Sequence, residues 1–142
     1  MDHIAEGQLK QLVSDIKTTL PYGSCIGIDH KAARVVNKSI GRVIKDDRDS
    51  WKFDREYNTL DNGTLGKKYD NSKDISEKQA VSDEVYNTYK KIGSKLAKLG
   101  ITMNFAPVLD LSHPAMQCGE ENRAFSTKVD TVIALGKSAV RG

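Results

Sequence analysis

Two aspartates, Asp29 and Asp110, each end an apolar run, and their carboxylates are the groups best placed for chemistry. Asp29 closes "SCIGID" at residues 24–29, and Asp110 closes "NFAPVLD" at residues 104–110. If both runs are parallel strands, the carboxylates share the edge of the sheet where such folds place catalytic groups. Two carboxylates at one edge are the minimum for acid–base chemistry. The simpler alternative is that each aspartate caps a loop through backbone amides.

Two histidines, His30 and His113, lie close to these aspartates in the sequence. A transition-metal site usually needs three or more protein ligands, and the chain has no His-x-x-His or comparable spacing. No glycine-rich phosphate loop follows either apolar run, which disfavours a nucleotide-binding protein. We therefore expect no metal and no other cofactor.

Helices are predicted on both sides of these runs. Apolar residues recur every three or four positions in three segments, and Pro21 and Gly100 end the first two. Asp74 followed by Glu77 forms a capping box for the second helix, and Ser126 is the expected N-cap of the third. The apolar stripes are Leu9, Leu12, Val13, Ile16 and Leu20; Val81, Val85, Tyr89, Ile92, Leu96 and Leu99; and Val129, Val132, Ile133 and Val140.

Strands are predicted at residues 24–29 and 101–109, and a polar, turn-rich stretch separates the first strand from the second helix. We interpret residues 41–74, which include an Asn-Gly pair, as a long surface excursion within a single domain. The order helix, strand, loop, helix, strand, helix predicts an α/β fold with parallel strands. Two such strands leave unpaired edges, which predicts pairing with further strands or with another copy of the chain.

Length and composition set limits on the class of protein. The 142 residues are enough for one domain, and the net charge of +3 comes from interleaved acidic and basic residues, which disfavours a nucleic-acid partner. No apolar run is long enough to span a membrane, and the N-terminus has no secretory leader pattern. Cys25 and Cys118 match no zinc spacing and fit free thiols, with a disulfide as the alternative. We therefore expect a cytoplasmic protein, with Cys25 buried and inert.

The motifs "KLGITMNFAPVLDLS" and "ENRAFST", with "IGIDHKAARVV" upstream, resemble glycoside hydrolase family 3 in its bacterial β-N-acetylhexosaminidase branch. The resemblance implies a segment of a (β/α)8 TIM barrel, because a whole barrel takes about 250 residues. It implies a carbohydrate partner, with terminal β-N-acetylglucosamine or β-glucose removed by a retaining mechanism. Asp29 and Arg123 would bind sugar hydroxyls, with Asp110 beside them. A carboxylate accepts hydrogen bonds and a guanidinium donates them, so together they can recognise a hydroxyl pattern.

Several positions depart from the family pattern. Lys31, Ala32 and Ala33 replace its Glu-Gly-Gly, and Asn37 stands where a second sugar-binding arginine is expected. A retaining enzyme needs a nucleophile and a proton donor about 5 Å apart, and in the family both come from segments beyond the match to Gly142. We therefore expect no catalytic residue in these 142 residues and no activity of the chain alone. The alternative is a non-catalytic module that binds carbohydrate or oligomerises through its strand edges.

Overall fold

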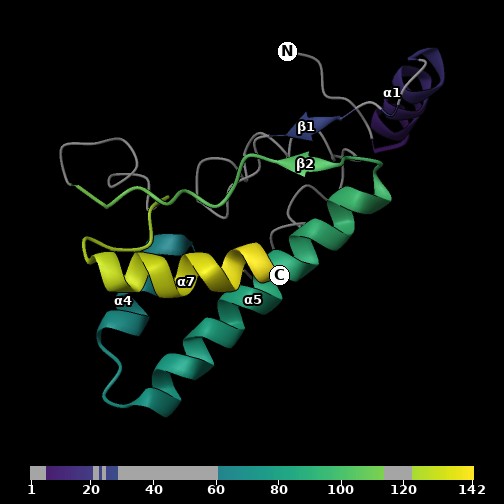
Figure 1. The fold of residues 1–142 in the computed structure, drawn as a ribbon. Coiled ribbons are helices and arrows are strands. Elements are labelled where there is room, and N and C mark those ends of the chain that lie inside the picture. Colours follow the sequence, from purple (N-terminus) through teal and green to yellow (C-terminus); the bar gives the residue numbers. More distant parts are fainter. Residues whose placement is uncertain (1–5, 21–22, 24, 29–60, 114–122) are drawn as a thin grey trace.

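The computed structural model describes residues 6–20, 23, 25–28, 61–113 and 123–142. Within these residues the chain forms four helices and two very short strands (Figure 1). In chain order they are α1 (Glu6–Thr19), β1 (Gly27–Ile28), α4 (Asn62–Asp70), α5 (Ile75–Lys98), β2 (Met103–Asn104) and α7 (Val129–Arg141).

Helix α5 confirms the strongest sequence prediction. The Asp74 side chain accepts a hydrogen bond from the Glu77 backbone N–H at 2.8 Å and so caps the helix. The Glu77 carboxylate accepts from the Lys73 N–H at 2.7 Å, one residue earlier than a standard capping box. The predicted stripe is buried at every position: Val81, Val85, Tyr89, Ile92, Leu96 and Leu99. Local spacing and capping were sufficient to locate this helix.

Gly100 ends α5 in the left-handed conformation, with φ of 82°. The Ile101 N–H then bonds back to the Leu96 carbonyl at 3.0 Å, which satisfies a carbonyl that the helix end would leave open. A Cβ on Gly100 would lie 2.7 Å from Cγ1 of Val13 in α1. The close approach of α1 to the end of α5 therefore depends on this glycine.

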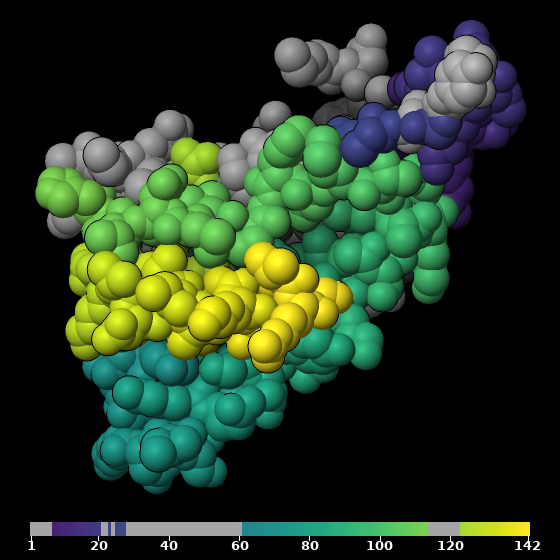
Figure 2. All heavy atoms as spheres, viewed as in Figure 1, coloured from purple at the N-terminus to yellow at the C-terminus, as the bar shows by residue number. Residues whose placement is uncertain are grey.

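The core lies between α4, α5 and α7, which pack against one another (Figure 1). In the space-filling view α7, in yellow, lies between the green segment after β2 and the teal atoms of α4 and α5 (Figure 2). Leu65 of α4, Val85 of α5 and Leu135 of α7 are all completely buried. The remaining buried members of the cluster are Val81, Tyr89, Ile92, Leu96, Leu99, Ile101, Phe125, Val132 and Ala139.

Helix α7 is where predicted, but its start and its buried face differ from the prediction. Lys128, not Ser126, is the N-cap residue, and its side chain makes no capping hydrogen bond. Val132 is buried as expected, whereas Val140 is 70% exposed. The buried face consists of Thr131, Val132, Leu135, Gly136 and Ala139, so small and polar residues complete a stripe that apolar residues alone did not define.

The two predicted strands pair in parallel, but only over two residues each. Gly27 pairs with Met103 and Ile28 with Asn104. Further along, an isolated parallel bridge joins Val108 to Ala124. Between these contacts lies Pro107, which has no N–H to donate to a ladder, so the apolar run 101–109 does not continue as a strand.

The predicted α/β fold, a TIM-barrel segment, is wrong for the described residues. Helices hold most of them, and the core is formed between helices instead of against a sheet. The apolar run after β2 is not a buried strand, since Phe105 is 60% exposed and Leu109 53%. Hydrophobic runs alone do not distinguish a strand from an extended segment, and a two-stranded ladder offers few neighbours to cover its faces.

Part of the predicted excursion at residues 41–74 is an ordered helix. Residues 41–60 lie outside the described residues, but α4 occupies Asn62–Asp70, with Asn62 and Leu65 fully buried. The Asn-Gly pair at its start is not a hairpin turn, because the Asp61 side chain accepts from the Thr64 N–H at 2.8 Å and caps the helix there.

Candidate functional site

Two of the three predicted site residues, Asp110 and Arg123, lie on two neighbouring backbone segments, 105–113 and 123–128. The Val108–Ala124 bridge joins these segments, and the Ser112 N–H donates to the Ser126 carbonyl at 2.8 Å. Asp110 is exposed on the first segment, and Arg123 is half-buried at the start of the second. Asp29 lies outside the described residues. The structure therefore brings the Asp110 and Arg123 segments together without placing the third predicted residue.

The register sets the separation of Asp110 and Arg123 along these segments. Because Val108 pairs with Ala124, the residue opposite Arg123 is Pro107, and Asp110 lies three residues further along. At about 3.3 Å per residue this is roughly 10 Å of backbone. Because successive side chains of an extended segment point to opposite sides, residues three positions apart lie on opposite sides of it, so the register alone does not give Asp110 and Arg123 a shared face.

Helix α4 holds the segment of Arg123 through polar contacts that sequence reasoning missed. The Asn62 side-chain amide donates to the Arg123 carbonyl at 2.9 Å and also contacts the Tyr89 hydroxyl of α5. At the other end of α4, the Asp70 carboxylate accepts hydrogen bonds from Ser126 and Thr131, each at 2.6 Å. The available signal was the four-residue spacing of Asn62, Gly66 and Asp70 in "NGTLGKKYD", which puts them on one helix face.

Among the described ionisable residues, Asp70 shows the clearest pKa shift in the folded protein. Burial raises the pKa of its carboxyl group, but hydrogen bonds from Ser126 and Thr131 and the charge of Lys128 outweigh burial, so the pKa falls below its ordinary value of 3.8. The Lys128 ammonium lies 3.6 Å away and is largely exposed. Asp70 is therefore ionised at neutral pH and is unsuited to donate a proton.

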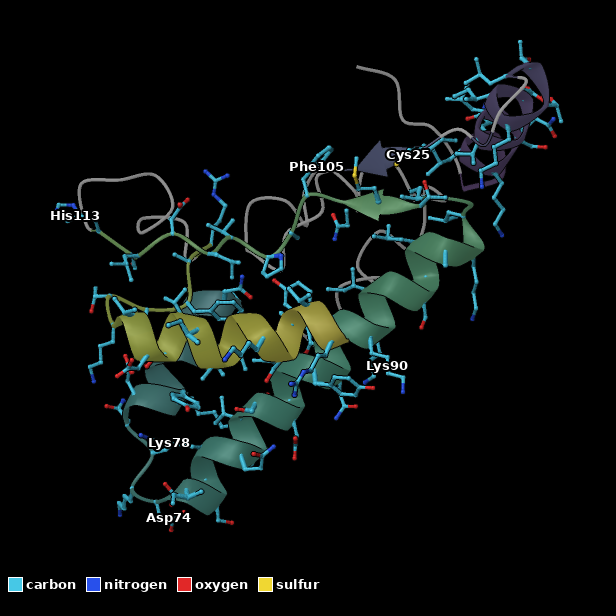
Figure 3. The ribbon with its side chains drawn as sticks, in the orientation of Figure 1. Cys25, Asp74, Lys78, Lys90, Phe105 and His113 are labelled. Carbon is cyan, nitrogen blue, oxygen red and sulfur yellow. The ribbon has the colours of Figure 1, made fainter. Side chains whose placement is uncertain are left out.

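Among the other described residues with reactive or metal-binding side chains, no metal-binding cluster is found. Cys25 is exposed, contrary to the prediction of a buried thiol, and its sulfur lies 4.0 Å from the Met103 sulfur. Cys25 lies near the strands, and His113 lies at the opposite end of the segment that follows β2 (Figure 3). Within the described ranges, no group of three or more His, Cys, Asp or Glu side chains is arranged to hold a metal ion. No helix in this part of the chain is long and apolar enough to cross a membrane.

Comparison with protein families gives one match that covers the candidate segments. The family model for the glycosyl hydrolase family 3 N-terminal domain matches residues 71–142, half of the chain, which include both Asp110 and Arg123. The match begins immediately after α4. A comparison with curated proteins found no match.

Proposed function

From the premise that the chain belongs to glycosyl hydrolase family 3, we propose that it binds a terminal β-linked N-acetylglucosamine or glucose residue. The observation that supports this proposal is the bridge between Val108 and Ala124, because it joins the two backbone segments that carry Asp110 and Arg123. A guanidinium donates hydrogen bonds and a carboxylate accepts them, so the two residues offer both kinds of partner that sugar hydroxyl groups need. Asp29 is proposed as the third contact.

We propose further that residues 1–142 bind sugar without cleaving it. Retaining hydrolysis needs two carboxyl groups about 5 Å apart, one of which must carry a proton. Asp70, at the far end of α4 from the Arg123 contact, is ionised and accepts hydrogen bonds from Ser126 and Thr131. Asp110 is exposed to solvent. A cytoplasmic location belongs to the same proposal.

The test is an NMR titration of the 142-residue protein with N-acetylglucosamine, alongside a chromogenic β-N-acetylglucosaminide assay. We expect saturable shifts at the amides of residues 108–112 and 123–126 and no release of chromophore. Replacing Arg123 by Lys keeps the charge but removes the guanidinium fork, and should weaken binding about tenfold, equivalent to one charge-assisted hydrogen bond. The matched control is Arg141→Lys, at the far end of α7. Turnover of the substrate would refute the non-catalytic part, and unchanged affinity in Arg123→Lys would refute the site.

A second candidate function is self-association through the segment that includes β2. Four large apolar side chains are between 42% and 60% exposed along it: Met103, Phe105, Leu109 and Leu111. An exposed row of apolar side chains is typical of a surface that another protein chain covers. Light scattering with size-exclusion chromatography tests it: a dimer that Phe105→Ser converts to a monomer would support this function, and a monomeric wild type would exclude it.

A further inference from the structure

Three positions on α4 form one face that contacts the Arg123 segment. Asn62, Gly66 and Asp70 are spaced by four residues, so the three positions lie above one another on one face of the helix. We call these three residues the α4 contact face. Each of them contacts a different part of the stretch from Arg123 to Thr131.

The first contact fixes the backbone of Arg123 itself. Asn62 has no exposed surface, and its amide nitrogen donates to the Arg123 carbonyl at 2.9 Å. The Tyr89 hydroxyl lies 3.1 Å from the same nitrogen and 3.2 Å from the Asn62 amide oxygen. A buried amide held by an aromatic hydroxyl has one favourable orientation, because any rotation would leave a polar atom unpaired. The Arg123 carbonyl therefore has a fixed partner.

The second contact depends on the absence of a side chain. A Cβ added to Gly66 would lie 1.6 Å from the Phe125 carbonyl oxygen and 2.5 Å from its carbonyl carbon. No L residue with a side chain can keep this distance, so either α4 or the Phe125 backbone would have to move. Phe125 is only 1% exposed, and its ring is part of the core. The backbone two residues after Arg123 thus rests directly on α4.

The third contact holds the far end of the stretch. The Asp70 carboxylate accepts from Ser126 and Thr131, both at 2.6 Å, and lies 3.6 Å from the Lys128 ammonium. Ser126 and Thr131 are 6% and 3% exposed, so both hydroxyls would lose their partner in a nearly water-free environment if Asp70 were removed. The stretch is therefore attached to α4 at both ends and supported in the middle.

We propose that the α4 contact face positions Arg123 for sugar binding, so that Asn62, Gly66 and Asp70 are positioning residues of the site. This inference rests on the function proposed above. A guanidinium binds hydroxyl groups with a defined geometry when its own backbone is fixed, and the Arg123 carbonyl accepts a hydrogen bond from Asn62 of α4. All three residues precede the family match at residues 71–142, so this support comes from outside the matched region.

The test uses two variants of the α4 contact face and one control on the same helix. Asn62→Asp keeps the side-chain shape but removes the donor to Arg123, and Gly66→Ala adds the clashing methyl group. Lys68→Ala removes only an exposed ion pair with Glu84, at 2.6 Å, on another side of α4. For each protein, amide hydrogen exchange is measured without ligand, and the dissociation constant for N-acetylglucosamine is measured by NMR titration.

We expect exchange at the amides of residues 124–126 to rise about tenfold or more in both contact-face variants, while α5 amides near Val85 change by less than about twofold. Sugar affinity should fall about fivefold or more, and Lys68→Ala should alter neither quantity. An equal rise in exchange throughout α5 would overturn the proposal, because the residues would then stabilise the whole fold. Faster local exchange with unchanged sugar affinity would overturn it too. If the wild type fails to bind sugar, the proposed function falls, and the local exchange result alone decides whether α4 holds the segment.

Discussion

The helical body and the segment that begins with β2 use apolar residues in different ways. In α5 and its C-cap, every member of the predicted stripe is buried, and the helix ends are capped. Between Met103 and Leu111, four large apolar side chains remain substantially exposed although this stretch is richer in hydrophobic residues than α5. Helical periodicity supplies its own buried face, whereas an extended run needs neighbouring strands to cover it. Stability should therefore reside in the body, and the segment should tolerate change.

The largest expected difference in stability comes from replacing one phenylalanine by alanine in each of the two regions. Phe125→Ala empties a core position that is 1% exposed and should lower the free energy of unfolding by about 3–5 kcal/mol. Phe105→Ala removes a ring that is 60% exposed and should cost less than about 1 kcal/mol. Urea unfolding followed by circular dichroism measures both. Equal losses would show that the segment is as much a part of the core as the helices are.

Two glycines in the helical body should respond in opposite ways to replacement by alanine. Gly66→Ala forces a methyl group into the Phe125 carbonyl and should destabilise the protein by about 1–3 kcal/mol. Gly93→Ala, within α5, meets nothing within 4 Å and should stabilise it by about 0.5–1 kcal/mol, since alanine is the better helix former. Thermal unfolding should move in opposite directions for the two variants. A neutral Gly66→Ala would mean that α4 shifts freely over the Arg123 segment.

Asp70 makes the junction between the helices sensitive to pH. Because its pKa is lower in the folded protein than in the unfolded chain, its stabilising contribution is complete above the ordinary value of 3.8 and is lost as the pH falls through the lowered value. Asp70→Asn should lose about 1–2 kcal/mol at neutral pH, and the difference from the wild type should shrink as the solution is acidified below about pH 4. Urea unfolding at a series of pH values measures this, and a difference that stays constant down to pH 3 would contradict it.

The smallest expected effect concerns the start of α5. Asp74→Ala removes the acceptor for the Glu77 N–H and should cost about 1 kcal/mol. Asp74→Ser, which retains a capping oxygen, should recover most of the loss. Urea denaturation of the two variants side by side is the measurement. Identical losses would show that a serine hydroxyl cannot replace the carboxylate as the cap, and no loss in either variant would show that the cap adds nothing to the first turn of α5.

Sequence patterns predicted the elements that are specified locally. The stripe from Val81 to Leu99 and the residues Asp74 and Gly100 located α5, because spacing and capping act within one or two turns. The position of helix α1 was also predicted, with its end at Thr19 before Pro21. Its predicted stripe is only partly buried, since Val13 is 4% exposed but Leu12 is 47% and Leu20 48% exposed. The parallel direction of the strand pair was confirmed as well, although only two residues of each run take part.

The failures involve contacts between residues far apart in the chain. Helix α4 looked like a polar turn because its burial depends on Tyr89, 27 residues later, and on the Arg123 segment. Ser126 was predicted to cap α7, but its hydroxyl donates to Asp70, 56 residues earlier, while accepting from the Lys128 N–H. The predicted barrel segment failed because pairing beyond two residues cannot be inferred from hydrophobicity. The sugar contacts of Asp29, Asp110 and Arg123 stay a prediction.

Position 100 should tolerate fewer substitutions than its place at the end of a helix suggests. Its φ of 82° disfavours side chains, and the space where a Cβ would go is already taken by Val13. A library of all substitutions at this position should therefore contain no second well-tolerated amino acid, including asparagine, which accepts the backbone angle but not the crowding. Most exposed positions of α5 should accept substitutions, whereas any substitution of Gly100 should disrupt the contact between α5 and α1.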